Sequence, residues 1–216
     1  MAALDDLRSS ATIDDYDAVA RAYVEANADH DVSQNVDALL LELRSSDEER
    51  ELTILDLGCG GGRDLAALAR RRCVVWGVDG SPAMCALAAA ACPEATILVQ
   101  NFVDGLDVPA GAFDGVFANA SLFHVPFEHL PSVLCRIRAA LRPGGVLFAS
   151  TRVSWADAEG YVEGRSPGGR AWVSTPSEST WDDTVAAAGF DLLRGWHRGD
   201  VTNYYCTLWR KVAGVD

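Results

Sequence analysis

Residues 54–64 read ILDLGCGGGRD, and this stretch decides the fold. A short apolar run that is bounded by glycine is typical of a parallel strand covered on both faces. The glycines turn the chain sharply and let a ligand approach the backbone, because they have no Cβ atom. The helix expected after them directs its free N–H groups and the positive end of its dipole toward the loop. The stretch therefore predicts a strand, a ligand-binding loop and a helix in succession.

The spacing of the glycines separates two classes of ligand. A dinucleotide-binding loop follows the pattern G-x-G-x-x-G. Counting from Gly58 the third glycine falls on Arg63, and counting from Gly60 it falls on Leu65, so the pattern fails in both registers. The pattern that remains is an acidic residue followed by three alternate glycines. It resembles the first motif of the class I S-adenosylmethionine (SAM) methyltransferases.

In that family the loop wraps the methionine part of SAM, and the acid at the end of the strand faces its amino group. The resemblance implies SAM as the cofactor and S-adenosylhomocysteine as the product. The residues that it places in this part of the site are Asp56, Gly58, Cys59, Gly60 and Arg63.

The composition limits the partners of the chain. It has 216 residues, of which 49% are hydrophobic and 23% charged, enough for one domain with a full core. The net charge is −13. Phosphate backbones bind to fields of Lys and Arg that this chain lacks, so we expect small zwitterionic or neutral partners and no nucleic acid. The longest apolar stretch, around residues 84–92, is too short to span a bilayer, and we expect no membrane partner.

The cysteines and the N-terminus indicate the compartment. The six cysteines include no Cys-x-x-Cys pair, so we interpret them as reduced thiols and expect no metal site. Asp5, Asp6 and Arg8 interrupt any apolar core of a signal peptide. These features favour a cytoplasmic protein. The sequence leaves its oligomeric state open.

The first fifty residues are expected to be mainly helical. Residues 12–44 have helical periodicity that is interrupted near residues 29–32, and Tyr16 and Tyr23 share one face. Ser33 is the expected N-cap of the second helix. A charged linker at residues 45–51 leads into the first strand. We expect residues 1–50 to form a helical lid.

Seven apolar runs predict strands, at residues 53–57, 73–78, 96–100, 113–118, 146–151, 191–196 and 204–211. Ser81 and Pro82 are the expected N-cap and first residue of one intervening helix. Residues 175–178 form an expected capping box, with Pro176 at the first helical position. Residues 152–174, between the predicted strand at residues 146–151 and this capping box, are predicted to be irregular. Loops of this length are usually functional or mobile.

Strands that alternate with helices predict an α/β fold with a mainly parallel sheet and helices on both faces. The resemblance implies the Rossmann-like, seven-stranded sheet of the class I methyltransferases. We expect residues 51–216 to form a single SAM-binding unit. Ligands of such sheets bind at the carboxyl ends of the strands, near the point where the strand order reverses.

Polar residues follow the second and third predicted strands. Asp79 ends the second strand, where a carboxylate can accept both hydroxyls of a ribose; Gly80 and Ser81 directly follow it. The alternative for Asp79 is an exposed acid in a turn. Asn101 and Phe102 follow the third strand as a polar group and an apolar wall for an adenine. The family usually has an acid at the place of Asn101, and the alternative is an ordinary loop.

Residues 113–126, FDGVFANASLFHVP, resemble the fourth strand and following turn of the same methyltransferases. The resemblance implies that Asn119 and His124 line the site of methyl transfer and that Asn119 also contacts the cofactor. A single histidine in a loop is more often a structural group, and that alternative stays open for His124.

Residues 29–35, DHDVSQN, are unusually polar for a helix junction, and Tyr16 and Tyr23 precede them. Together with residues 59–64 and 118–126 they resemble the methyltransferase domain of ovothiol biosynthesis, which methylates an imidazole nitrogen of 4-mercaptohistidine. This resemblance spans residues 14–151, with a weaker match over the last helix and strand. It implies an acceptor held by Tyr16, Tyr23, Asn119 and His124, with His30, Gln34 and Asn35 as further substrate-binding residues.

An amino-acid acceptor would need a cation for its carboxylate. Arg152 and Arg170 are the expected partners, with Arg165 as an alternative, since guanidinium groups bind carboxylates through paired hydrogen bonds. The alternative for each of them is a solvated arginine in a loop.

The sequence therefore predicts a SAM-dependent methyltransferase that modifies an imidazole ring of a small histidine-like molecule. Three other functions remain open. They are methylation of another small N, O or S acceptor, SAM binding without catalysis in a partner protein, and a nicotinamide-dependent oxidoreductase, which the glycine spacing disfavours.

Overall fold

The computed structural model describes residues 7–44, 50–198 and 204–214. The charged linker expected at residues 45–51 lies mostly outside the described residues. Asp5 and Asp6, which argued against a signal peptide, lie outside them as well.

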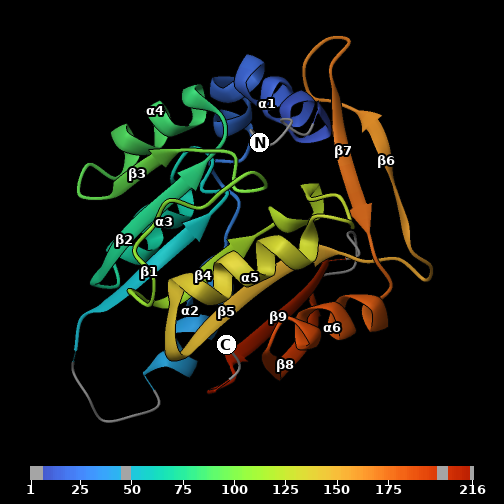
Figure 1. Cartoon of the computed structure of the whole chain (residues 1–216). Coiled ribbons are helices and arrows are strands. Elements are labelled where there is room, and N and C mark those ends of the chain that lie inside the picture. The colour runs from blue at the N-terminus through green and yellow to red at the C-terminus, as the bar shows by residue number, and fades with distance from the viewer. Residues whose placement is uncertain (1–6, 45–49, 199–203, 215–216) are drawn as a thin grey trace.

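Seven strands within the described ranges form one sheet (Figure 1). Its order is β3-β2-β1-β4-β5-β9-β8, and β9 is the strand that runs antiparallel to its neighbours. The strands are β1 (Leu52–Leu57), β2 (Cys73–Asp79), β3 (Thr96–Val99), β4 (Phe113–Asn119), β5 (Leu141–Arg152), β8 (Phe190–Arg198) and β9 (Tyr204–Lys211). The predicted α/β fold with a mainly parallel, seven-stranded sheet is confirmed.

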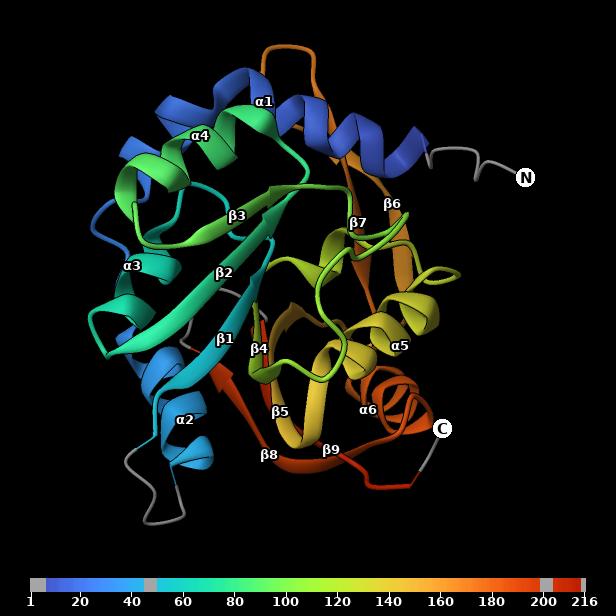
Figure 2. The same cartoon turned by 60° about the vertical axis from the view of Figure 1, so that its left-hand side comes forward.

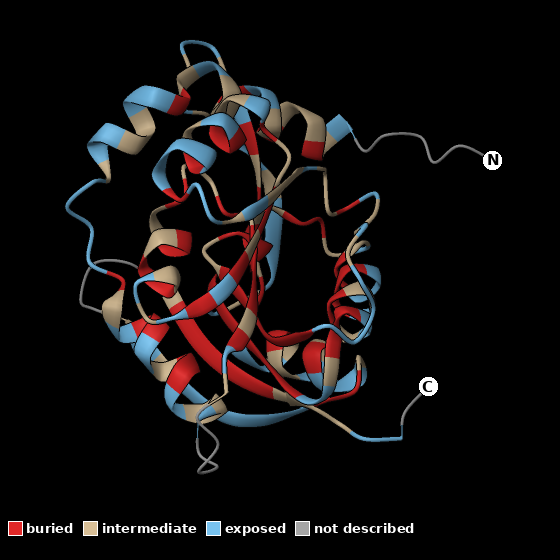
Figure 3. Cartoon of the chain, turned by 90° about the vertical axis from the view of Figure 1, so that its left-hand side faces the viewer, coloured by how far each residue is buried: buried red, intermediate tan, exposed pale blue. Residues whose placement is uncertain are grey.

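Helices cover both faces of this sheet (Figure 2). One face carries α2 (Ser33–Leu43), α3 (Arg63–Ala69) and α4 (Pro82–Ala91). The other carries α5 (Leu130–Ala140) and α6 (Glu178–Ala187). Buried residues concentrate in the strands between these two layers (Figure 3).

The apolar run of β1 explains why the sheet is covered on both sides. Ile54, Leu55 and Leu57 are all fully buried. Ile54 belongs to the core under α2 and α3, whereas Leu55 and Leu57 belong to the core under α5. Successive side chains of a strand point to opposite faces, so a strand between two cores carries apolar side chains on both faces.

The strand order reverses next to β1, which creates a crevice at the carboxyl ends of β1 and β4. The chain continues from β1 to β2 and β3 on one side and returns to β4 on the other. Helix α1 (Leu7–Ala26) lies across this edge of the sheet, beside α4 (Figures 1 and 2).

The prediction of an irregular segment at residues 152–174 is wrong. Strands β6 (Ala158–Glu163) and β7 (Arg170–Thr175) form an antiparallel hairpin, in which Tyr161 lies opposite Trp172. Five of the six residues of β6 are exposed, so this strand has no alternation of apolar and polar positions by which to recognise it. Its pairing with β7, which packs on α1, defines it instead.

Two predicted helix starts are also wrong, by one and two residues. Helix α2 begins at Ser33, and Val32 is its N-cap. Helix α6 has Ser177 as its N-cap, whose hydroxyl accepts from the backbone N–H of Thr180 at 3.2 Å. Thr175 cannot cap this helix because it is the last residue of β7.

The predicted start of α4 is confirmed. Ser81 is the N-cap, its hydroxyl accepts from the N–H of Met84 at 3.0 Å, and Pro82 is the first helical residue. No helix in the described part of the chain is long and apolar enough to cross a membrane.

Candidate functional site

The glycine loop after β1 has a conformation that needs its glycines. Gly58, Gly60 and Gly62 have φ values of 79°, 51° and 84°, in the left-handed region that side chains disfavour. A Cβ atom on Gly58 would also lie 2.4 Å from Cβ of Ser121, in the loop after β4. The loop therefore passes closely between the carboxyl ends of two neighbouring strands.

Two further glycines allow α1 to approach this loop. A Cβ atom on Gly61 would lie 2.3 Å from a methyl group of Val24, and one on Gly80 would lie 2.4 Å from Cδ1 of Ile13. Val24 and Ile13 both belong to α1. The helix is thus packed directly against the loops that follow β1 and β2.

A cavity of about 470 Å³ lies between α1 and these loops, a volume suited to a small-molecule site. It brings together most of the residues that the sequence predicted. Those that line it are Tyr16, Tyr23, Gly58, Cys59, Gly60, Arg63, Asp79, Gly80, Asn101, Phe102, Asn119 and His124.

Asp79 lies at the end of β2 with its carboxylate against the glycine loop. One oxygen accepts from the N–H of Gly60 and the other from the N–H of Ser81, both at 2.9 Å. Burial raises the pKa of this carboxyl, and the amide hydrogen bonds partly offset that effect. Each oxygen has a second acceptor position, as two ribose hydroxyls would require.

Asn101 and Phe102 line the same cavity from the loop after β3. The side chain of Asn101 donates to Asp104 at 2.7 Å and accepts from the N–H of Val103 at 3.1 Å. Phe102 packs against the core. Hydrogen bonds between its own residues therefore hold the conformation of this loop. They also place the carboxylate of Asp104 next to the side chain of Asn101.

A chain of polar side chains connects three elements at the switch point. Asp64, in the first turn of α3, accepts from Arg63 at 2.6 Å and from Asn119 at 2.9 Å. Asn119 in turn accepts from Asn35 of α2 at 3.2 Å. The sequence analysis missed Asp64, which is buried and lines the cavity. Its signal was an acid in the first turn of the helix after the glycine loop.

Asp56 lies beneath the glycine loop and does not line the cavity. It is 2% exposed, and within the described ranges its Oδ2 has no hydrogen-bond partner. Burial, and then the neighbouring carboxylate of Asp64, hold the pKa of Asp56 well above its usual range. Asp56 is therefore not among the residues that line the cavity, and its contact with the cofactor, which the resemblance implied, stays a prediction.

Tyr16, Tyr23 and His124 form an aromatic group at the cavity. The ring of Tyr16 meets those of Tyr23 and His124 edge-on, with centroids 5.2 and 5.5 Å apart. Nδ1 of His124 lies 2.7 Å from the carbonyl oxygen of Trp172, and Nε2 lies 3.1 Å from the hydroxyl of Tyr16. Because a carbonyl can only accept, we assign the proton to Nδ1, so that Nε2 accepts from Tyr16.

Tyr16 and His124 are neutral at pH 7. Burial lowers the pKa of His124 to about 4. Burial also raises the pKa of the Tyr16 hydroxyl, which stays protonated. The structure thus offers the cavity aromatic surfaces and a fixed hydroxyl instead of a charged base.

The other predicted site residues do not line the cavity. His30 and Gln34 are exposed, and Nε2 of His30 contacts Arg198 at 2.7 Å. Asn35 reaches the cavity only through its bond to Asn119. Ser81 is 1% exposed and caps α4.

The two predicted arginines lie farther along the chain. The guanidinium of Arg152 lies 5.8 Å from the ring centre of Phe123, and that of Arg170 lies 4.1 Å from that of Tyr161. Tyr161 belongs to the exposed strand β6. The structure therefore places Arg170 on the hairpin, away from the cavity.

Hydrogen bonds join helix α1 to neighbouring elements on both sides of the cavity. On one side Asp17 accepts from the hydroxyl of Ser81 at 2.6 Å and from the N–H of Ala83 at 2.8 Å, at the start of α4. On the other side Thr12 accepts from the N–H of Trp172 at 2.8 Å, in β7.

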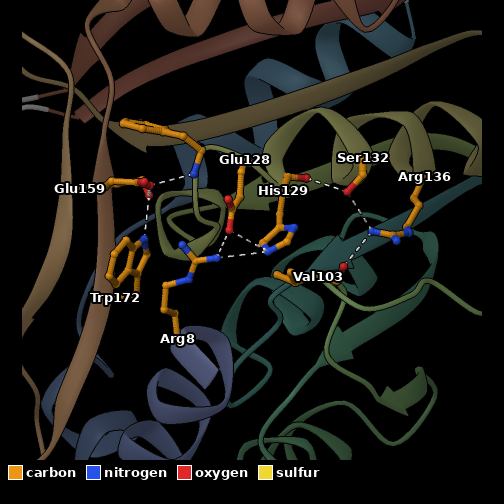
Figure 4. Close-up of polar contacts among 10 residues, drawn as sticks. Arg8, Val103, Glu128, His129, Ser132, Arg136, Glu159 and Trp172 are labelled. Atoms are coloured by element: carbon orange, nitrogen blue, oxygen red, sulfur yellow. Dashed lines mark hydrogen bonds and ion pairs between the residues drawn. The ribbon is translucent and has the colours of Figure 1, made fainter. Parts of the chain in front are cut away.

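The first turn of α1 is joined to α5 (Figure 4). Arg8 forms an ion pair with Glu128 and lies 3.3 Å from Nε2 of His129, at the start of α5. Its guanidinium also stacks over Trp172 at 5.1 Å. These contacts, with those of Thr12 and Asp17, hold α1 over the crevice along its length.

Residues 7–44, 50–198 and 204–214 contain no group of three His, Cys, Asp or Glu side chains that could hold an ion. The cysteines of these ranges are free thiols.

Sequence comparisons find methyltransferases among the proteins that this chain resembles. Residues 54–145 match the family described as a methyltransferase domain. The chain is 41% identical over 96 residues to trans-aconitate 2-methyltransferase of Deinococcus radiodurans, which covers 44% of this chain and 35% of that protein. It is 36% identical over 105 residues to a ubiquinone biosynthesis O-methyltransferase of Xanthomonas campestris, with coverage of 45% and 42%. The match thus spans less than half the length of these curated relatives.

A solved structure shares the whole fold. It is 1,6-didemethyltoxoflavin-N1-methyltransferase of Burkholderia thailandensis, with bound 1,6-didemethyltoxoflavin and S-adenosylhomocysteine. The TM-score is 0.75 at 21% identity, covering 94% of this chain and 88% of that one. The fold is therefore that of the class I methyltransferases, which use SAM.

Proposed function

We propose that this protein transfers a methyl group from SAM to a small acceptor, and that the acceptor atom is a ring nitrogen of an imidazole. The acceptor would be 4-mercaptohistidine or another histidine derivative, as in ovothiol biosynthesis. One observation carries the proposal: the cavity is lined both by the glycine loop and Asp79 and by the aromatic group of Tyr16, Tyr23 and His124.

The residues at the strand ends fit the cofactor. Gly60 has open space where a Cβ atom would lie, and Asp79 offers acceptor positions for two ribose hydroxyls. Asn101 and Phe102 would hold the adenine. Bound SAM supplies a methyl group that its sulfonium charge already activates.

Methyl transfer to this acceptor depends more on alignment of the acceptor nitrogen than on proton transfer. A neutral imidazole has a nucleophilic nitrogen at pH 7, because its pKa is about 6.5. Positioning of two reactants can lower a barrier by roughly 7–11 kcal/mol. His124 fixes the hydroxyl of Tyr16 through Nε2, and Tyr16 and Tyr23 would orient the ring. Aromatic faces near a sulfonium add about 0.5–2 kcal/mol of cation–π attraction.

The names of the similar proteins leave the acceptor atom open. The solved neighbour is an N1-methyltransferase, which supports a nitrogen acceptor on this fold. The relatives are named for trans-aconitate and for O-methylation in ubiquinone biosynthesis. Methylation of another small acceptor is therefore the second candidate. SAM binding without catalysis, as a partner protein, is the third.

The acceptor is tested by incubating the protein with SAM and a panel of histidine, mercaptohistidine and related imidazoles, followed by mass spectrometry. We expect an imidazole to gain one methyl group. Methylation of another acceptor, with every imidazole unchanged, would contradict the imidazole assignment. Cofactor binding without any methylation would support the partner protein.

The cofactor is tested by calorimetry. We expect S-adenosylhomocysteine to bind and NAD not to bind, because the loop lacks the dinucleotide spacing. Binding of NAD alone would favour an oxidoreductase.

We also propose that the protein is cytoplasmic and that its partners are small molecules. The free cysteines support the compartment, and the small-molecule cavity supports the partners.

A further inference from the structure

The turn of the β6–β7 hairpin is built around a carboxylate of α1. Asp15 accepts from the N–H groups of Arg165 and Ser166 at 2.7 and 2.9 Å. Cβ atoms on Gly164 and Gly169 would lie 2.3 and 1.9 Å from Oδ1 of Asp15. The two glycines let the turn close over this carboxylate, which fixes the backbone of Arg165.

The side chain of Arg165 lies against the aromatic group of the cavity. Its guanidinium is 4.6 Å from the ring centre of Tyr16 and 5.1 Å from that of Tyr23. Both rings line the cavity, whereas Arg165 is exposed and does not line it. The guanidinium thus lies beside the cavity, on rings that an acceptor would touch.

A second guanidinium lies near the same group. Arg152, at the end of β5, stacks over Phe123, and the rings of Phe123 and His124 have centroids 4.2 Å apart. The charges of Arg165 and Arg152 add to the lowering of the His124 pKa, which burial causes first. Both charges also act on Tyr204, whose pKa burial raises.

Neither of these two arginines has an acidic partner among the described residues, although other arginines of the chain do. Arg50, Arg71 and Arg142 each have a carboxylate within 2.8 Å. Among the residues that the structure describes, neither Arg165 nor Arg152 has a carboxylate within ion-pair distance. In a chain with a net charge of −13, two unpaired cations beside one cavity indicate an anionic ligand.

The nearby acid does not neutralise this site. Asp15 feels the charge of Arg165, but its oxygens accept hydrogen bonds from the Arg165 and Ser166 backbone and from the Ser166 hydroxyl. These bonds hold the pKa of Asp15 low against the effect of burial. Asp15 therefore positions Arg165 through the backbone and leaves its guanidinium unpaired.

We propose that the methyl acceptor carries a carboxylate, which Arg165 binds beside Tyr16 and Tyr23, with Arg152 as a second cation. A guanidinium is planar and binds a carboxylate through two parallel hydrogen bonds. Stacking on tyrosine rings restricts its orientation before the acceptor arrives, which lowers the entropy lost on binding. This inference rests on the proposed methyl transfer and adds the charge of the acceptor to it.

The test compares acceptors in pairs, each an acid and its amide, built on imidazole, pyridine and phenol rings. The variants are Arg165→Gln and Arg152→Gln. Arg194→Gln is the matched control, because Arg194 also stacks on an aromatic ring, Trp196 at 4.8 Å, but lies on the edge strand β8. The wild type should have a lower KM for the acid of the pair that it methylates.

Arg165→Gln should raise the KM for the acid by roughly 10- to 100-fold, the scale of a charged hydrogen bond, and leave kcat and the KM for the amide near their wild-type values. Arg152→Gln should act in the same direction but less. Arg194→Gln should behave as the wild type does. Equal KM values for acid and amide in the wild type, or an equal rise for both in Arg165→Gln, would overturn the inference.

Calorimetry with S-adenosylhomocysteine distinguishes failure of the carboxylate inference from failure of the proposed function. All three variants should bind it as the wild type does, which also shows that they fold. If the wild type fails to bind it, the methyltransferase proposal falls. If the wild type binds it and methylates the amide with the same KM as the acid, the inference alone falls.

Discussion

Asp79 is the residue on which the cofactor site most depends. Its carboxylate joins the glycine loop to the start of α4 through the N–H groups of Gly60 and Ser81. It lines the cavity, as Asp64 also does, whereas Asp56 does not. Loss of the carboxylate should therefore affect both the loop and the ligand.

Replacing Asp79 by Ala should weaken binding of S-adenosylhomocysteine by roughly 1.5–3 kcal/mol, the scale of a hydrogen bond to a charged group. Calorimetry measures this directly. Asp79→Asn keeps the size of the side chain and is the control for the packing. Unchanged affinity in Asp79→Ala would remove this residue from the site.

His124 should make the stability of the protein depend on pH. Its pKa is about 4 in the folded state and about 6.5 in the unfolded chain. As the pH falls from 6.5 to 4, the unfolded state binds the proton first, so the free energy of unfolding decreases. The contribution lost is about 3 kcal/mol, and it is fully present above pH 6.5.

Urea unfolding of the wild type and of His124→Gln measures this effect. Between pH 7 and about pH 4 the free energy of unfolding should fall by about 3 kcal/mol more in the wild type than in the variant. Groups other than His124 titrate in both proteins and cancel in the comparison. Parallel curves would show that this histidine is not buried in its neutral form.

At the scale of elements, the pairing of α1 with the β6–β7 hairpin shapes the acceptor side. Thr12 and Asp15 of α1 accept from backbone N–H groups of Trp172, Arg165 and Ser166. In return, the carbonyl of Trp172 fixes His124. Neither element forms this surface alone, since the contacts span about 150 residues of sequence.

Asp15→Ala should release the turn of the hairpin, because it leaves the part-buried backbone N–H groups of Arg165 and Ser166 without their acceptor. Hydrogen exchange at residues 161–170 should become faster. Asp14→Ala is the matched control, since Asp14 is the exposed neighbour on the same helix. Equal exchange in both variants would show that Asp15 does not hold the turn.

At the scale of the molecule, the two N-terminal helices have different roles. Val36, Leu39 and Leu40 of α2 belong to the core on one face of the sheet. Helix α1, which is described in full, adds Ala20 as its one buried hydrophobic residue. Within the described residues α1 lies over the crevice and α2 packs on the sheet, and the lid expected over residues 1–50 stays a prediction.

A chain that begins at residue 31 should therefore fold, with S-adenosylhomocysteine binding weakened by the loss of Ile13 and Val24 against the glycine loops. Acceptor binding should be lost, because Tyr16 and Tyr23 are removed. Circular dichroism and calorimetry measure the two effects. An unfolded product would show that α1 is part of the core instead of a cover.

The sequence alone determined the sheet and the glycine loop, and it predicted twelve of the residues that line the cavity. Local patterns carry this information, since strand burial, turn glycines and strand-end residues are properties of neighbouring positions. The same reasoning misplaced the caps of α2 and α6 and missed the hairpin, because β6 has no apolar face to mark it.

The tertiary structure alone decided how the cavity is charged. It places Asp64 in the polar chain with Asn119, keeps His124 neutral, and moves Arg165 next to Tyr16 and Tyr23 while Arg170 lies elsewhere. These properties depend on burial and on partners that are distant in sequence. No pattern of neighbouring residues encodes them, because a side chain's pKa and partners are fixed only when the elements pack.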